Sequence, residues 1–176
     1  GTRGSARNDN EIQKDNELFC MQGIQSMIES GCKMIVLAGS QAEYGNSSNV
    51  ITEEIEPHPN TEYGKRKLAL YQDATSICAS SNIPILEPRF FSLYGPGDVK
   101  NTLVSGLLTK MLHNEQCDLT ECTQIWDFMY ISDAVDALFK LIVMKAHGVY
   151  NIASGDCRQL KSFVEEMKHT LNSSSK

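Results

Sequence analysis

The chain has 176 residues, a net charge of −6, 41% hydrophobic residues and 22% charged residues. This length allows one domain with a sizeable core, and the composition is that of an ordinary globular protein. The net negative charge and the absence of a basic stripe argue against a nucleic-acid partner. The sequence has no signal peptide and no apolar stretch of about 18 residues, so we expect a cytoplasmic protein.

Helix and strand patterns alternate along the first half of the chain. Apolar residues recur at helical spacing from Glu11 to Ser30, followed by Gly31, which suits the end of a helix. Met34 to Ala38 is a continuous apolar run, typical of a strand buried on both faces of a parallel sheet. A long loop from Gly39 to Thr61 and a second helix from Glu62 to Ser80 are predicted next.

The second half of the chain continues the alternation. The predicted elements are a buried strand within Ile83–Phe91, a sharp break at Leu93–Asp98, a helix at Leu103–Leu112, a strand at Ile125–Ile131, a helix capped by Ser132 and Asp133 that reaches Met144 or Lys145, a strand at Gly148–Ala153 and a helix at Leu160–Leu171. Strands that alternate with helices predict an α/β protein with a mainly parallel sheet.

The six cysteines form no C-x-x-C motif, and most of them stand among apolar residues. Cys117 and Cys122 are close enough in sequence for half of a metal site, but no second pair or histidine cluster follows them. We therefore expect buried free thiols and no metal ligands.

Ser40, Tyr63 and Lys67 carry side chains suited to proton transfer. Ser40 ends the first strand-like run, and Tyr63 and Lys67 stand four residues apart near the start of the second predicted helix, a spacing that puts them on one face. The lysine ammonium could stabilise the phenolate, so that the tyrosine acts as a general acid or base at neutral pH. A functionless surface pair is the alternative, but sites in open α/β sheets lie at the carboxyl ends of strands, where Ser40 is expected.

Five segments follow one another in a characteristic order and spacing. They are Met34–Gly45 (MIVLAGSQAEYG), Tyr63–Lys67 (YGKRK), Arg89–Asp98 (RFFSLYGPGD), Trp126–Asp133 (WDFMYISD) and Gly148–Gly155 (GVYNIASG). Together they resemble an extended short-chain dehydrogenase/reductase of the NAD-dependent epimerase/dehydratase family, whose members modify nucleotide sugars. The resemblance covers almost all of the chain.

The resemblance implies a Rossmann-like doubly wound parallel sheet, part of a small substrate domain, and roles for individual residues. Tyr63 would be the catalytic acid or base, Ser40 its partner on the substrate oxygen, and Lys67 a ligand of the nicotinamide ribose. The remaining expected contacts are Asn16, Phe91 and Ser92 to the cofactor, NAD or NADP, and Gln41, Ser92 and Trp126 to the nucleotide-sugar substrate.

The chain departs from the family pattern at two of these positions. Ser92 stands where the family usually has asparagine, and Trp126 stands where it usually has arginine. Losing the arginine puts a standard diphosphate pocket in doubt. Trp126 either stacks on a base or sugar or packs in the core, and we favour the core. Ser40-Gln41-Ala42 replaces the Thr-Asp-Glu of 4,6-dehydratases, which favours a 4-reductase or an epimerase.

The family's G-x-x-G-x-x-G turn, which binds the cofactor pyrophosphate, is absent from this sequence. We therefore expect a fragment without the N-terminal βαβ units. Residues 1–95 would be the C-terminal part of the cofactor domain with the Ser-Tyr-Lys site, and residues 96–176 would mix substrate-domain segments with returning Rossmann elements. A homodimer through helices 11–30 and 62–80 is expected. The alternative function is that of a non-catalytic binding or dimerisation module.

Overall fold

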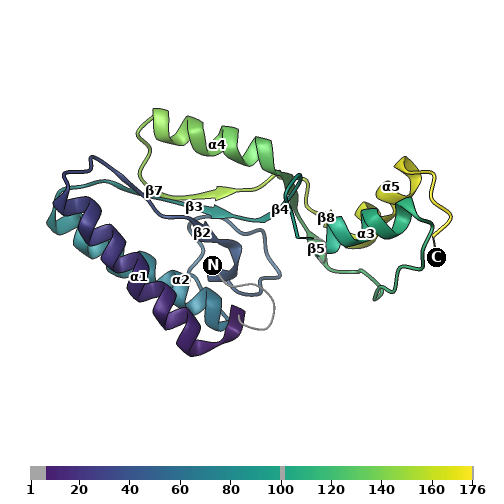
Figure 1. The fold of residues 1–176 in the computed structure, drawn as a ribbon, viewed down its shortest axis with the longest axis horizontal. Helices are drawn as coiled ribbons and strands as arrows, with labels where there is room; N and C mark the ends of the chain where they lie inside the picture. The colour runs from purple at the N-terminus through teal and green to yellow at the C-terminus, as the bar shows by residue number, and fades with distance from the viewer. Residues whose placement is uncertain (1–6, 100–101, 176) are drawn as a thin grey trace. The chain divides into compact units, whose positions relative to one another are not determined.

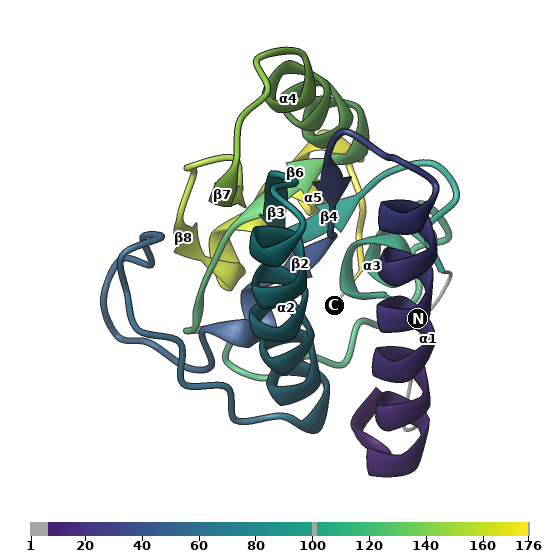
Figure 2. The same ribbon diagram turned by 90° about the vertical axis from the view of Figure 1, so that its left-hand side faces the viewer.

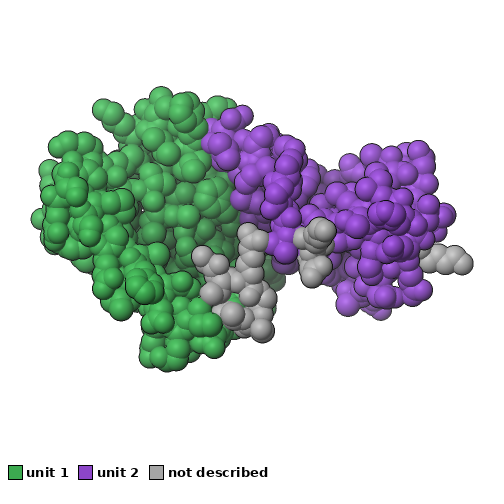
Figure 3. Space-filling view, in the orientation of Figure 1, with its two compact units in different colours: residues 1–90, 138–152 green, residues 91–137, 153–176 purple. Residues whose placement is uncertain are grey.

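A computed structural model describes residues 7–99 and 102–175 of the chain. The chain divides into two compact units (Figure 3). Unit 1 consists of residues 1–90 and 138–152, and unit 2 consists of residues 91–137 and 153–176. None of the helices within the described ranges is both long enough and apolar enough to span a bilayer.

The centre of unit 1 is a parallel sheet built around β3 (Ile85–Phe90). β1 (Ile35–Val36) and β2 (Gly39–Ser40) pair in succession along one edge of β3, and β7 (Gly148–Ile152) pairs along its other edge. The predicted α/β class with a mainly parallel sheet is confirmed. The carboxyl ends of β2 and β3 meet in register, with Ser40 opposite Phe90.

Two long helices cover one face of this sheet. α1 (Asn10–Glu29) and α2 (Glu62–Ser80) lie side by side, and residues 138–143 of α4 lie on the opposite face (Figures 1 and 2). Both helices begin at capping side chains, because Asp9 accepts a hydrogen bond from the Ile12 N–H and Thr61 accepts one from the Gly64 N–H. The core between helices and sheet consists of Ile24, Ile35, Leu70, Ala74, Cys78 and Ile85.

The expectation that the first strand is buried on both faces is wrong. β3 is buried along nearly its whole length, as a central strand should be, but Val36 in β1 is 40% exposed. β1 lies at an edge of the sheet in the described part of the chain, so it has a neighbouring strand on one side alone.

Unit 2 contains two small sheets. β4 (Ser92–Tyr94) pairs in parallel with β6 (Phe128–Tyr130), and β5 (Ile125–Trp126) pairs antiparallel with β8 (Arg158–Gln159). The helices of this unit are α3 (Leu103–Leu112) and α5 (Leu160–Thr170), both close to their predicted ranges.

α4 (Ile131–Val143) begins before the two residues that were predicted to cap it. Ser132 and Asp133 therefore lie within its first turn, and their predicted role as caps is wrong. Asp133 is still well placed, because a negative charge in the first turn interacts favourably with the helix dipole.

Candidate active site

Ser40 is the last residue of β2 and the first of a tight turn. Its backbone is extended, and it caps the short 3-10 helix η2 (Gln41–Glu43). Its Oγ accepts a hydrogen bond from the Ala42 N–H at 3.2 Å, and its own N–H donates to Oε1 of Glu43 at 2.7 Å. The serine is thus buried and held from both its backbone and its side chain.

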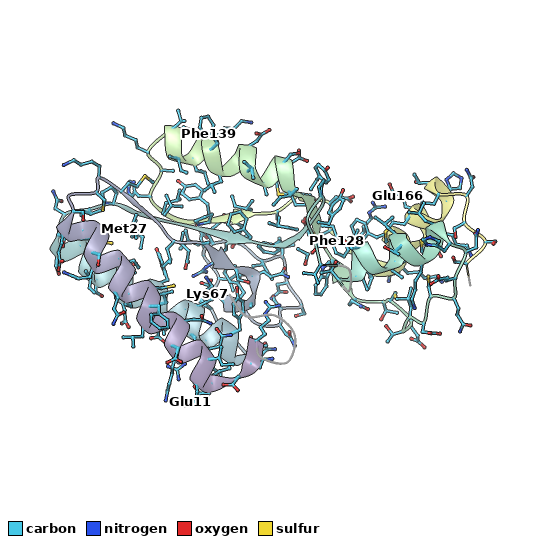
Figure 4. All side chains as sticks on the ribbon, viewed as in Figure 1. Glu11, Met27, Lys67, Phe128, Phe139 and Glu166 are labelled. Carbon is cyan, nitrogen blue, oxygen red and sulfur yellow. The ribbon has the colours of Figure 1, made fainter. Side chains whose placement is uncertain are left out.

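Tyr63 and Lys67 lie one turn apart at the start of α2, as their spacing predicts. The Nζ of Lys67, which Figure 4 labels, donates to the carbonyl oxygen of Ala38 at 2.6 Å, and Ala38 comes just before β2. The guanidinium of Arg7 lies 4.3 Å from the centre of the Tyr63 ring, over its face. The lysine therefore connects the start of α2 to the strand that ends at Ser40.

Gly64 makes the second close approach between α2 and this strand. A Cβ added there would lie 2.2 Å from the carbonyl oxygen of Ala42, so no larger residue fits without a shift of backbone. Lys67 contacts the chain two residues before Ser40, and Gly64 contacts it two residues after. The start of α2 is therefore fixed against both sides of the serine.

Asn16 lies on α1 beside the same two α2 residues. Asn16, Tyr63 and Lys67 line one small cavity of about 120 Å³, with Gln13, Glu17, Cys20, Arg66 and Leu70. This volume is below the roughly 300 Å³ at which ligand pockets begin, so the cavity alone holds no cofactor. A phenol, an ammonium and a carboxamide that face one small space do match the hydroxyl groups of a ribose, since all three donate hydrogen bonds.

Ser92 and Trp126 contact each other in unit 2. The indole N–H of Trp126 donates to Oγ of Ser92 at 2.8 Å, so the two departures from the family pattern form one pair. Trp126 is 38% exposed, which makes the favoured expectation of core packing wrong. β5 has just two residues and pairs with β8 at the surface, and its side chains stay exposed. Phe91, the first residue of this unit, and Gln41, in η2, are partly buried.

The residues that sequence reasoning missed form a buried ionic cluster in unit 1. The Nε of Arg89 donates to Oε2 of Glu87 at 2.9 Å and lies 3.0 Å from Oε2 of Glu43. All three side chains are almost completely buried. The Arg89 guanidinium also lies over the ring of Tyr44, whose hydroxyl donates to Asn151.

Burial raises the pKa of both carboxyl groups in this cluster. The pKa of Glu87 rises to about 8, first because of burial and second because of the negative charge of Glu43. Burial also raises the pKa of Glu43, against the opposing effect of Arg89. A signal was present in the sequence, because Glu87 and Arg89 stand two residues apart in an apolar strand and so share one face.

Unit 2 contains a larger cavity, of about 550 Å³. Its walls include two edge-to-face aromatic pairs, Tyr94 with Tyr130 and Phe128 with Phe163. Phe128 and Glu166 mark its position in Figure 4. Aromatic walls suit the stacking of a base or sugar ring. The charged lining consists of Asp133, Asp156, Arg158 and Glu166.

The sequence profile of the NAD dependent epimerase/dehydratase family matches residues 1–153. The chain belongs to this family. Among curated proteins, the dTDP-4-dehydro-6-deoxyglucose reductase of Escherichia coli is 26% identical to this chain, over 92% of this chain and 55% of that enzyme. The chain thus spans about half the length of that curated relative.

Solved structures of similar proteins agree with the family and the fold. The UDP-N-acetylglucosamine 4-epimerase from Bacillus cereus superimposes with a TM-score of 0.85 at 26% identity, over 97% of this chain and 60% of that one. The protein MoeE5, solved in complex with UDP-glucuronic acid and NAD, superimposes with a TM-score of 0.78 at 27% identity, over 87% of this chain and 54% of that one.

Proposed function

We propose that the full-length protein is an NAD(P)-dependent oxidoreductase of nucleotide-activated sugars, a 4-reductase or an epimerase. The observation that supports this most directly is the double contact of α2 around Ser40. Lys67 bonds to Ala38, and Gly64 lies against Ala42. This arrangement holds a hydroxyl at a strand end beside the helix turn that carries a phenol and an ammonium.

The proposed chemistry assigns one role to each of these groups. Tyr63 transfers the proton of the sugar hydroxyl as general base or acid. Lys67 supplies a fixed positive charge that stabilises the phenolate, because Coulomb attraction at about 4 Å is large where water is partly excluded. Ser40 hydrogen-bonds the same sugar oxygen and orients it.

The nicotinamide cofactor supplies the hydride step when it is bound. Asn16, Tyr63 and Lys67 would hold its ribose, because they face one cavity with hydrogen-bond donors. Phe91 and Ser92 are the proposed contacts to the nicotinamide. The complex of the similar protein MoeE5 with NAD supports a nicotinamide dinucleotide, NAD or NADP, as the cofactor.

Substrate recognition is assigned to Gln41, Ser92 and Trp126. The Trp126–Ser92 hydrogen bond fixes the indole, whose partly exposed face can stack on a base or sugar. The cavity of unit 2 has three carboxylates and one guanidinium in its lining, which disfavours a diphosphate there. We therefore propose unit 1 as the cofactor unit and unit 2 as the unit that reads the nucleoside or the sugar.

The catalytic role of Tyr63 is tested by Tyr63→Phe in the full-length protein. Turnover is measured by nicotinamide absorbance with CDP-, dTDP-, UDP- and GDP-linked 4-keto sugars. We expect kcat to fall by about 10²-fold or more, with cofactor affinity changed less than about threefold, since general acid–base catalysis contributes about 10²–10⁴-fold. Tyr150→Phe, which removes an exposed phenol from β7, is the matched control and should leave turnover unchanged.

Unchanged turnover in Tyr63→Phe would refute the proposed role. A wild-type protein that binds neither nicotinamide cofactor nor any nucleotide sugar would instead favour the second candidate function, a binding or dimerisation module. The specific observation that favours this candidate is the exposed apolar surface of α1, where Phe19 and Met27 are 67% and 46% exposed.

A further inference from the structure

We propose that Glu43 is the positioning residue for Ser40, and that Arg89 and Glu87 hold Glu43 in place. This inference rests on the proposed function, because it assigns the buried cluster a task in orienting the serine hydroxyl. None of the three side chains is exposed enough to contact a substrate.

The contacts run in a chain from β3 to the serine. Arg89 in β3 binds Glu87 through Nε and lies within ion-pair distance of Oε2 of Glu43. The other oxygen of Glu43, Oε1, accepts the Ser40 N–H at 2.7 Å. A short, charge-assisted hydrogen bond to a backbone amide fixes where the strand ends and hence where the Ser40 side chain begins.

The strand residue before Ser40 is packed directly against the cluster. A Cβ added at Gly39 would lie 2.8 Å from Cγ of Glu87, 2.9 Å from Cγ of Arg89 and 3.1 Å from Oε1 of Glu43. These short distances show that the side chains of the cluster pack directly against the backbone of β2. Movement of Glu43, Glu87 or Arg89 would therefore be transmitted to Ser40.

The cluster also acts on the second catalytic candidate through charge. Burial raises the pKa of Glu43, and the positive charge of Lys67 lowers it, after the larger lowering effects of Arg89, the Ser40 N–H and the hydrogen bond with Glu87. Glu43 therefore interacts with Ser40 by a hydrogen bond and with Lys67 by Coulomb attraction. A group that interacts with both can set their relative positions.

A role limited to helix capping does not explain this arrangement. Ser40 and Glu43 form a capping box around η2, and a capping box works equally well at the surface. Burying two carboxyl groups beside one guanidinium costs free energy, because charged groups leave water and because burial and the nearby Glu43 raise the pKa of Glu87 to about 8. The cap of a three-residue 3-10 helix stabilises the fold too little to offset that cost. We therefore assign the buried cluster the task of fixing the Ser40 hydroxyl.

The test is a double-mutant cycle of Glu43→Ala and Ser40→Ala in the full-length protein. Single-turnover rates at high enzyme concentration are measured with the best sugar from the substrate screen. Alone, Glu43→Ala should lower the rate by about 10-fold to 100-fold and leave the KM for the sugar within about threefold. In the Ser40→Ala background it should lower the rate by less than about twofold, because the residue that it positions is already gone.

Two further variants separate positioning from loss of folding. Glu53→Ala is the matched control, because Glu53 also accepts a backbone N–H, that of Asn151, at 2.7 Å in unit 1, but does not contact Ser40. It should leave the rate unchanged. If Glu43→Ala does not fold, Glu43→Met, which fills a similar volume but offers no oxygen to the Ser40 N–H, takes its place in the cycle.

Equal rate losses from the Glu43 substitution in both backgrounds would overturn the positioning role and leave the proposed function standing. Absence of wild-type turnover with every sugar and both cofactors would instead refute the proposed function, and the positioning role with it. Non-additive losses in an active enzyme support both.

Discussion

Glu87 shows how a single buried residue makes the stability of this protein depend on pH. Its pKa rises from an ordinary 4.5 to about 8 in the folded chain, because it is buried and lies near Glu43. Between these values the folded protein keeps a proton that the unfolded chain releases. The free energy of unfolding therefore falls as pH rises from about 5 to about 8, and this contribution is complete below the lower pKa.

Glu87→Gln should remove this pH dependence. Glutamine has the shape of the protonated carboxyl group but cannot ionise, so the variant should lose less stability than the wild type between pH 5 and pH 8. Urea unfolding of both full-length proteins at several pH values gives the comparison, because every other titrating group is common to the two. Parallel stability curves would contradict a raised pKa at Glu87.

At the scale of single residues, the sequence predicted which residues lie close together on one helix better than it predicted which side chains are buried. The Tyr63–Lys67 spacing placed both residues on one helix turn, because local periodicity depends on near neighbours alone. The burial of Glu43 was missed, since its partners Glu87 and Arg89 come from a distant strand. The exposure of Trp126 was also missed, because no residue in its own segment indicates that β5 lies at the surface. The catalytic roles themselves stay predictions.

At the scale of elements, helix prediction succeeded where the pattern was long. α2 and α3 have the bounds that the sequence predicted, since recurring apolar residues defined both helices. The short strands were harder. Within the run Met34–Ala38 the structure has the two-residue strand β1, and β2 lies just after it, in the segment that was predicted to be loop. The two-residue β8 was not predicted at all, because its pairing with β5 is set by tertiary contacts.

The contact between α2 and η2 should be sensitive to one methyl group. Gly64→Ala would place a Cβ 2.2 Å from the carbonyl oxygen of Ala42, so either the helix or the serine turn must shift. Despite the better helix propensity of alanine, we expect a loss of about 1–3 kcal/mol in the free energy of unfolding, as for other overpacked sites. Turnover should fall as well, because the shift separates Tyr63 from Ser40.

Ser76→Ala is the control for this substitution on the same helix. Its hydroxyl is exposed and bonds back to the carbonyl of Gln72, so alanine there should change stability by less than about 0.5 kcal/mol. The free energy of unfolding of both variants is measured by denaturant unfolding, and the comparison holds where the m-value is unchanged. A Gly64→Ala protein as stable and as active as wild type would show that α2 is not tightly fixed against η2.

At the scale of the whole molecule, the proposed homodimer would use an exposed apolar face of α1. Phe19, Gly23 and Met27 follow one another at four-residue spacing, so they share one face of the helix. All three are exposed, and the two large side chains are apolar. A stable homodimer buries roughly 800 Å² on each partner, and long paired helices such as α1 and α2 can supply such an area.

Phe19→Glu should therefore convert a dimeric full-length protein into a monomer. A glutamate buried in the interface would lose its hydration without gaining a partner, which costs far more than the apolar contact it replaces. Light scattering coupled to gel filtration, at several protein concentrations, gives the mass of each species. Val50→Glu adds the same charge at an exposed loop residue outside both helices, and it should leave the dimer intact. A wild-type protein that stays monomeric at tens of micromolar would refute the dimer, and dissociation by Val50→Glu alone would place the interface elsewhere.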